Sequence, residues 1–155
     1  MQKATPKRRR WFQFSLRSLL AGMMWAALVI AICVGQQQAA SRQRAVIERL
    51  KAGLNDVLAK NEVAGHAHSI GSIVHLVLKD CDCDRHTCTM PHEEIKEAVA
   101  SPVVTLLKRA LQNSGVDMMG RDAFLVSAVH REEDVDRTLG AFEASLAALR
   151  LEGAI

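Results

Sequence analysis

The stretch A-F-L-V-S-A-V-H-R-E-E-D-V-D-R-T-L-G-A-F-E-A-S-L-A-A-L-R-L, Ala123 to Leu151, joins two different residue patterns. Its first seven residues, Ala123 to Val129, form a short apolar run, which predicts a buried strand. Three acidic residues then begin at Glu132, and apolar residues follow at three- and four-residue steps. These are Val135, Leu139, Phe142, Leu146 and Leu149. The pattern predicts an amphipathic helix over Glu132–Leu151 that ends at Gly153.

The segments before Ala123 predict more helices and one more strand. Arg42–Lys60 has the apolar period of an amphipathic helix, and Ser69–Leu78, rich in β-branched residues, is typical of a strand. Pro91 begins a helix at its first turn, and Ser101-Pro102 begins another that ends at Gly115. The predicted fold class is α/β, of the α+β kind: one transmembrane helix, then a small sheet packed with amphipathic helices.

Charge is distributed unevenly along the chain. The 155 residues carry a net charge of +3, but six of the 20 lysines and arginines, and none of the 17 acidic residues, precede residue 36. The rest of the chain therefore holds fourteen basic against seventeen acidic residues. A nucleic-acid-binding domain usually carries a basic patch. The sequence predicts no nucleic-acid partner.

The run Leu19–Gly35 contains no charged or strongly polar side chain. Its length is at the short end of the roughly 17–25 residues that cross a bilayer, and it exceeds the roughly 7–15 apolar residues of a signal peptide. We favour an uncleaved anchor; a cleaved signal and a buried core helix are the alternatives. The predicted parts are a basic tail (1–10), an anchor (11–35), a linker (36–41) and a domain (42–155). The basic tail predicts a single-pass protein with its N-terminus in the cytoplasm.

The stretch K-D-C-D-C-D-R-H-T-C-T-M-P-H-E-E, Lys79–Glu94, concentrates thiol and imidazole groups of the types that bind zinc. These are Cys81, Cys83, Cys88, His86 and His92. Their spacing, C-x-C and then C-x₄-C, departs from the usual C-x₂₋₄-C of structural zinc sites. We interpret the stretch as a polar loop. A metal site and, outside the cytoplasm, a disulfide are the alternatives.

The remaining histidines suggest no site by themselves. His66 and His68 would share one face of a strand, but no third metal ligand is near them in sequence, so we interpret them as turn or strand-entry residues. His75 is interpreted as a core or interface histidine and His130 as a capping or strand-end residue. Ser127, His130 and Asp134 have the residue types of a hydrolase triad. We reject a triad because they are sequence neighbours without an oxyanion-hole signature.

The segment Gly115–Arg150 resembles the C-terminal end of class III pyridoxal-phosphate aminotransferases, nearest to the branch with glutamate-1-semialdehyde aminomutase. Its most specific part is S-A-V-H-R-E-E-D-V-D-R-T, Ser127–Thr138. R-L-K-A-G-L-N-D-V-L, Arg49–Leu58, resembles the helix that opens the family's small C-terminal domain, so the resemblance covers about residues 44–155. Arg131 stands where the family often has a helix-capping threonine. Separately, residues 8–35 resemble a recurrent bacterial single-span leader.

The resemblance implies pyridoxal phosphate as the family's cofactor, held by a large domain with a lysine, a phosphate-binding loop and an aspartate. That domain would precede this one, and the apolar run stands in its place. We therefore expect no cofactor binding and no catalysis by this chain alone, and a fusion, a remnant or a wrongly assigned reading frame as its origin. The expected partners are the lipid bilayer and an aminotransferase large domain or a second copy.

The resemblance marks Asp122 as a candidate on the substrate side, whereas the residues alone suggest a solvated loop aspartate. Two alternative functions belong to other classes. One is a membrane-anchored binding module whose cysteine loop holds a metal or a disulfide. The other is a small adaptor for a partner at the membrane.

Overall fold

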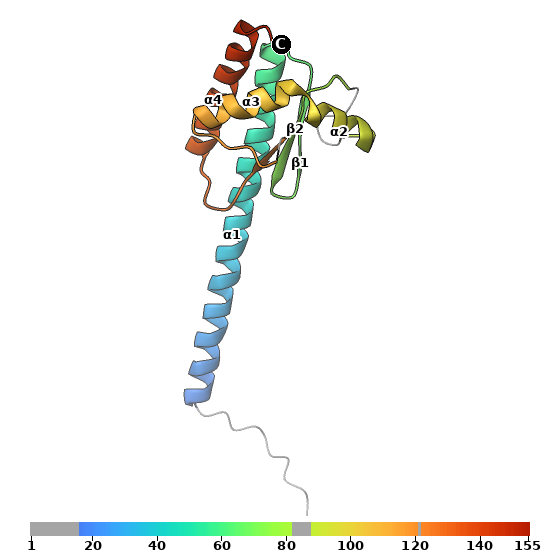
Figure 1. The fold of residues 1–155 in the computed structure, drawn as a ribbon. Coiled ribbons are helices and arrows are strands. Elements are labelled where there is room, and N and C mark those ends of the chain that lie inside the picture. Colours follow the sequence, from blue (N-terminus) through green and yellow to red (C-terminus); the bar gives the residue numbers. More distant parts are fainter. Residues whose placement is uncertain (1–15, 82–87, 121) are drawn as a thin grey trace, which may run out of the picture. The chain divides into compact units, whose positions relative to one another are not determined.

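The computed structural model describes residues 16–81, 88–120 and 122–155, and the predicted basic tail lies outside them. These residues form four helices and three strands (Figure 1). In chain order they are α1 (Leu16–Lys60), β1 (His66–Ile70), β2 (Ile73–Val77), α2 (His92–Ala100), α3 (Pro102–Asn113), β3 (Ala123–Leu125) and α4 (Glu132–Leu151). The predicted fold class is confirmed as a small sheet packed with helices after one long apolar helix; that this helix crosses a membrane stays a prediction. The chain divides into two units, residues 1–38 and 39–155, and each is described by itself.

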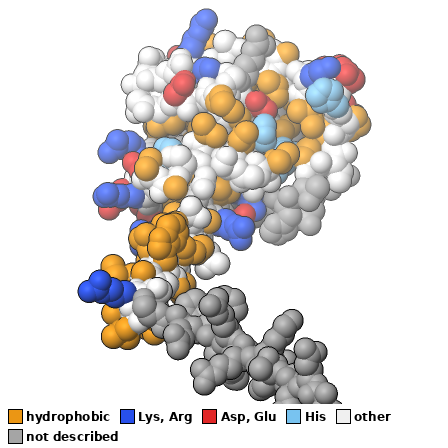
Figure 2. All heavy atoms as spheres, turned by 90° about the horizontal axis from the view of Figure 1, so that it is seen from below, with side chains coloured by type: hydrophobic (Ala, Val, Ile, Leu, Met, Phe, Trp, Pro, Cys, Tyr) orange, Lys and Arg blue, Asp and Glu red, His pale blue; other side chains and the backbone are white. Residues whose placement is uncertain are grey.

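The first half of α1 is apolar and exposed. Its most apolar 18-residue window has no buried side chain, and Met24 and Trp25 are 76% and 68% exposed. Its hydrophobic side chains form an almost continuous surface (Figure 2). Among the described residues this is the one helix long and apolar enough to cross a membrane; signal sequences and soluble core helices share that length and composition. Residues 36–41, the predicted linker, are helical here, and the predicted domain boundaries stay a prediction.

The second half of α1 forms the core of the folded unit together with α3 and α4. Leu54, Leu107 and Phe142 are fully buried in this core. Arg49 pairs with Glu132 and with Asp136 at 2.6 Å each. A second α1–α4 ion pair, between Lys60 and Glu143, also measures 2.6 Å. Because residue numbers rise together along both helices, α1 and α4 run in parallel. The amphipathic helix predicted from Arg42 to Lys60 is confirmed as this half of α1.

The sheet is antiparallel, in the order β1-β2-β3. The single strand predicted over Ser69–Leu78 is wrong, because a two-residue turn at Gly71-Ser72 divides this stretch between β1 and β2. Gly71 has a φ of +61°, which glycine adopts without a steric penalty. A glycine in the first position of a two-residue turn matches the twist of the paired strands. The hairpin brings the chain back along β1 and places His75 beside it.

The ends of α3 and α4 agree with the sequence predictions, whereas the helix predicted to begin at Arg42 is continuous with the apolar run before it. The helix predicted over Glu132–Leu151 is confirmed as α4, and Gly153 beyond it has a φ of +70°. Pro102 begins α3, and Gly115 after its end has a φ of +79°. At this end the N–H of Val116 donates to the carbonyl of Leu111 at 3.0 Å, the bond of a Schellman cap. The strand predicted over Ala123–Val129 is confirmed for its first three residues only.

Candidate functional site

The residues of β1 alternate between two faces of the sheet. Ala67 is fully buried in the core, so the neighbouring His66 and His68 point to the opposite face. Asn55 of α1 holds this strand from the core side. Its amide group donates to the carbonyl of Ala67 and accepts from the N–H of Ala67, both at 2.9 Å, and it also donates to the carbonyl of Lys51. This buried asparagine therefore sets the position of both histidines.

The hairpin register assembles three histidines on one face. His68 lies directly opposite His75, and their rings stack with centroids 5.4 Å apart at an angle of 18°. The rings of His66 and His68 also stack, at 5.4 Å and 28°. His75, interpreted from sequence as a core or interface histidine, is half-buried in this row.

Asp122 lies at the end of the histidine row. Its Oδ2 is 3.3 Å from Nδ1 of His75, and its backbone carbonyl accepts a 2.7 Å hydrogen bond from the N–H of Leu76. The side chain of Asp122 is 20% exposed, so it is less solvated than a free loop aspartate. Its predicted place on a substrate side stays a prediction.

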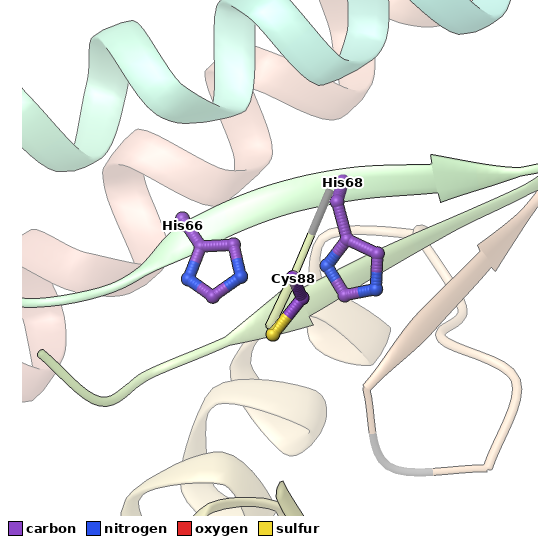
Figure 3. Close-up of side chains that lie close together, drawn as sticks. All are labelled: His66, His68 and Cys88. Carbon is purple, nitrogen blue, oxygen red and sulfur yellow. The ribbon is translucent and has the colours of Figure 1, made fainter. Parts of the chain in front are cut away.

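Two cysteines of the Lys79–Glu94 stretch lie next to the other end of the row. His66, His68 and Cys88 each offer one ligand atom, and the three atoms lie within 4.8 Å of one another (Figure 3). The sulfur of Cys81 is 3.4 Å from Nδ1 of His66. Of the other residues considered for zinc, Cys83 and His86 lie outside the described residues, and His92 is exposed at the start of α2.

Both buried histidines of β1 carry a ring nitrogen that lacks a partner. Nε2 of His66 and Nδ1 of His68 are buried and make no hydrogen bond within the part of the chain that the structure describes. Burial lowers the pKa of His66. The pKa of His68 is lowered by burial and by the charges of His66 and His75, while Asp122 acts in the opposite direction. Neutral imidazoles at neutral pH can accept a hydrogen bond or bind a metal.

The three residues named for a hydrolase triad do not assemble into one. His130 Nδ1 accepts a 2.9 Å hydrogen bond from the backbone N–H of Ser127 and lies 3.1 Å from its hydroxyl. The Asp134 carboxylate instead accepts from the N–H of Arg131 at 2.9 Å, which caps α4. The described contacts therefore serve the connection between β3 and α4.

Sequence reasoning considered the H-x-H pair and the cysteine stretch separately. It missed that His66 and His68 share a site with Cys88, about twenty residues away. The H-x-H spacing on a strand was the available signal, because it predicts two imidazoles on one face. The third ligand depends on how the chain returns after the hairpin.

The described lysines do not fit a cofactor that needs a free amine. Four of the five pair with a glutamate, and the fifth, Lys108, donates to the Gly120 carbonyl. The four pairs are Lys51–Glu48, Lys60–Glu143, Lys79–Glu94 and Lys96–Glu93. A hollow of about 210 Å³ lies beside β3 and the start of α4, and its lining includes His130, Asp134 and Arg137 but no lysine. Pyridoxal-phosphate chemistry requires a lysine at the cofactor. We therefore derive no step through this cofactor.

No family model matches the chain, and no curated protein matches it. Solved transaminase structures do match. The chain is similar to an omega-transaminase from Sphaerobacter thermophilus, with a TM-score of 0.60 and 22% identity over 73% of this chain and 25% of that one. A β-phenylalanine aminotransferase from Variovorax paradoxus matches at 0.54 and 22%, over 74% and 24% of the two chains. The FumI protein of Sphingopyxis sp. MTA144, solved with pyridoxal phosphate, matches at 0.55 and 17%, over 74% and 23%.

These likenesses establish the fold of the domain. The chain spans about a quarter of the length of each transaminase that it matches. It therefore has the fold of a partial aminotransferase domain, in agreement with the resemblance of residues 44–155.

Proposed function

We propose that the chain is a membrane-anchored, aminotransferase-like small domain that does not catalyse transamination alone and acts by binding a partner. The observation that carries this proposal is its match to a quarter of each transaminase over nearly three quarters of its own length. The closer likeness to the glutamate-1-semialdehyde aminomutase branch rests on Gly115–Arg150 and forms part of the proposal. The apolar first half of α1 supports the anchor, and the basic tail supports a cytoplasmic N-terminus.

An exposed row of apolar side chains on the sheet supports the proposal that the domain binds a partner. Ile70 lies opposite Ile73, and Ile73 lies opposite Leu125, so the three side chains share one face. Ile70 and Leu125 are 66% and 55% exposed within this chain. Exposed apolar side chains that lie together are typical of a protein interface. The proposed partner is a large domain of the aminotransferase type, and a second copy of this chain is the competing outcome.

Membrane fractionation of the full chain tests the anchor. We expect a 17.0 kDa product in carbonate-washed membranes. The double variant Leu28→Arg/Ile32→Arg should leave the membrane fraction, because each arginine near the centre of a span costs about 2.5–3.5 kcal/mol. The matched control Gln36→Arg/Ala40→Arg adds the same charges at the same spacing after the apolar run, and it should stay in the membrane. A smaller product would indicate a cleaved signal, and a soluble wild-type chain would contradict the anchor.

Two assays of the purified chain test the rest of the proposal. With pyridoxal phosphate, an amino acid and a keto acid, we expect no amine transfer; transfer that depends on the chain would contradict the proposal. The protein mass in mild detergent should be that of one chain, which supports a separate partner. Twice that mass would mean that a second copy covers the apolar row.

A further inference from the structure

The sheet face that carries the histidines contains polar groups that the described part of the domain leaves unpaired. His66 and His68 are only 6% and 8% exposed. Their nitrogens Nε2 and Nδ1, respectively, find no hydrogen-bond partner among the described residues. Buried polar atoms in folded proteins nearly always have a partner, and one that lacks it costs stability. A ligand that accepts electron pairs from both rings would remove this cost.

The neighbouring thiol completes the group of atoms that such a ligand would need. The Cys88 sulfur and one nitrogen from each of the two rings lie within 4.8 Å of one another (Figure 3). Around one zinc ion, ligand atoms lie about 3.3–3.7 Å apart, given metal–ligand bonds of about 2.0–2.3 Å. The gap to close is about 1 Å. Cys88 lies in the irregular segment before α2, so its side chain can close the gap while the sheet stays unchanged.

The donor set favours a particular class of cation. Imidazole nitrogens and a thiolate suit zinc and similar divalent transition metals, whereas calcium and magnesium prefer oxygen ligands. Zinc is usually four-coordinate, so three protein ligands leave one position open. The Cys81 sulfur lies 3.4 Å from Nδ1 of His66, which is the ring nitrogen other than the unpaired Nε2. A water would therefore fill the fourth position.

We propose that His66, His68 and Cys88 bind a zinc-class divalent metal ion that ties the segment before α2 to the β1–β2 hairpin. On binding, the Cys88 thiol loses its proton to solvent, and its thiolate coordinates the metal together with the two neutral imidazoles. The site depends neither on the membrane anchor nor on the aminotransferase likeness, so it can fail while the proposed function holds. It also differs from the alternative site within the cysteine stretch, which takes His86 or His92 as its imidazole and excludes the strand histidines.

Cobalt(II) is the probe of choice, because its absorption reports both thiolate ligation and tetrahedral geometry. The full chain is purified in detergent without a polyhistidine tag, reduced, stripped with a chelator and titrated. We expect one cobalt ion per chain, thiolate charge-transfer bands in the near ultraviolet, intense visible bands, and displacement by zinc. The same zinc should raise the unfolding temperature of the stripped protein.

Variants assign the ligands. His66→Phe, His68→Phe and Cys88→Ser should each weaken binding by more than about tenfold, because even partners of the ligands are worth about 10–100-fold. His68→Phe also distinguishes the loss of a metal ligand from misfolding as the cause of lost cobalt binding. It removes an unpaired buried nitrogen, so the stripped variant should be at least as stable as the stripped wild type while it fails to bind cobalt.

The matched controls are His92→Phe and Cys33→Ser, which remove an imidazole and a thiol elsewhere in the chain. Both should bind cobalt like the wild type. Retention of binding in His66→Phe and His68→Phe would overturn the proposal in favour of a site within the cysteine stretch, and loss of binding in His92→Phe would then identify His92 as its imidazole. A wild-type chain that gives no cobalt bands would overturn it altogether.

Discussion

Alternate residues of the same strands make the two faces of the β1–β2 hairpin. The two faces differ in whether their buried polar groups are hydrogen-bonded. On the core face Asn55 makes three hydrogen bonds, two of them to Ala67. On the other face His66 and His68 are almost as buried, and each keeps one unpaired nitrogen. A polar group buried for stability is paired within the fold, so the two unpaired nitrogens indicate a ligand that the described residues do not supply.

Removing the asparagine gives the largest expected effect on this comparison. Asn55→Leu breaks three hydrogen bonds and leaves the N–H and carbonyl of Ala67 buried and unpaired. We expect the free energy of unfolding to fall by about 2–4 kcal/mol, measured by urea unfolding of the full chain in detergent.

Asn61→Ala is the matched control, because Asn61 follows the same helix and its side chain donates only to the Val57 carbonyl. It should cost at most about 1 kcal/mol. Equal losses in the two variants would mean that the core face is not specially secured by Asn55.

Lowering the pH should lower the free energy of unfolding through the two buried histidines, His66 and His68. The pKa values of His66 and His68 in the folded domain lie below their usual 6.5. As the pH falls below about 6.5, the unfolded chain binds protons that the folded domain does not, so the free energy of unfolding decreases; above this pH it is unaffected. The expected slope is at most about 1.4 kcal/mol per pH unit for each histidine. Urea unfolding at about pH 7.5 and about pH 5.5, with a chelator present, measures it.

Among the described residues, His75, Cys81 and Cys88 lie beside these two rings, and the charge of Asp122 acts on His68. The double variant His66→Phe/His68→Phe should therefore flatten the slope, while His92→Phe, which changes an exposed ring, should keep it. An unchanged slope in the double variant would assign the acid sensitivity to other groups.

A substitution at Arg131, which belongs to neither face of the hairpin, should have the smallest effect on the free energy of unfolding. Arg131 is the N-cap of α4, and its side chain cannot accept a hydrogen bond from the first turn of the helix. Arg131→Thr should raise the free energy of unfolding by about 0.5–1 kcal/mol, because a threonine hydroxyl can accept from that turn. Arg131→Ala is the control, and equal stability of the two variants would show that no cap forms.

Helices were predicted well because their signals are local. The bounds of α4 follow from its acidic first turn, its apolar stripe and Gly153, all within one stretch. The hairpin was missed because an apolar run around Gly71-Ser72 has the composition of one long strand. A turn of this kind is recognised by its two-residue length and its glycine, and both were present in the sequence.

By itself the sequence determined the class of the fold, the apolar run before residue 36 and the ends of α3 and α4, because periodicity, charge and capping act between residues a few positions apart. Only the tertiary structure decided that His66 and His68 meet Cys88 and that His75 stacks on His68. These contacts depend on the register of the hairpin and on the path of the chain after it. The two-residue turn fixes the register, and Asn55 of α1 holds β1 through Ala67, so no local pattern in the cysteine stretch records these contacts.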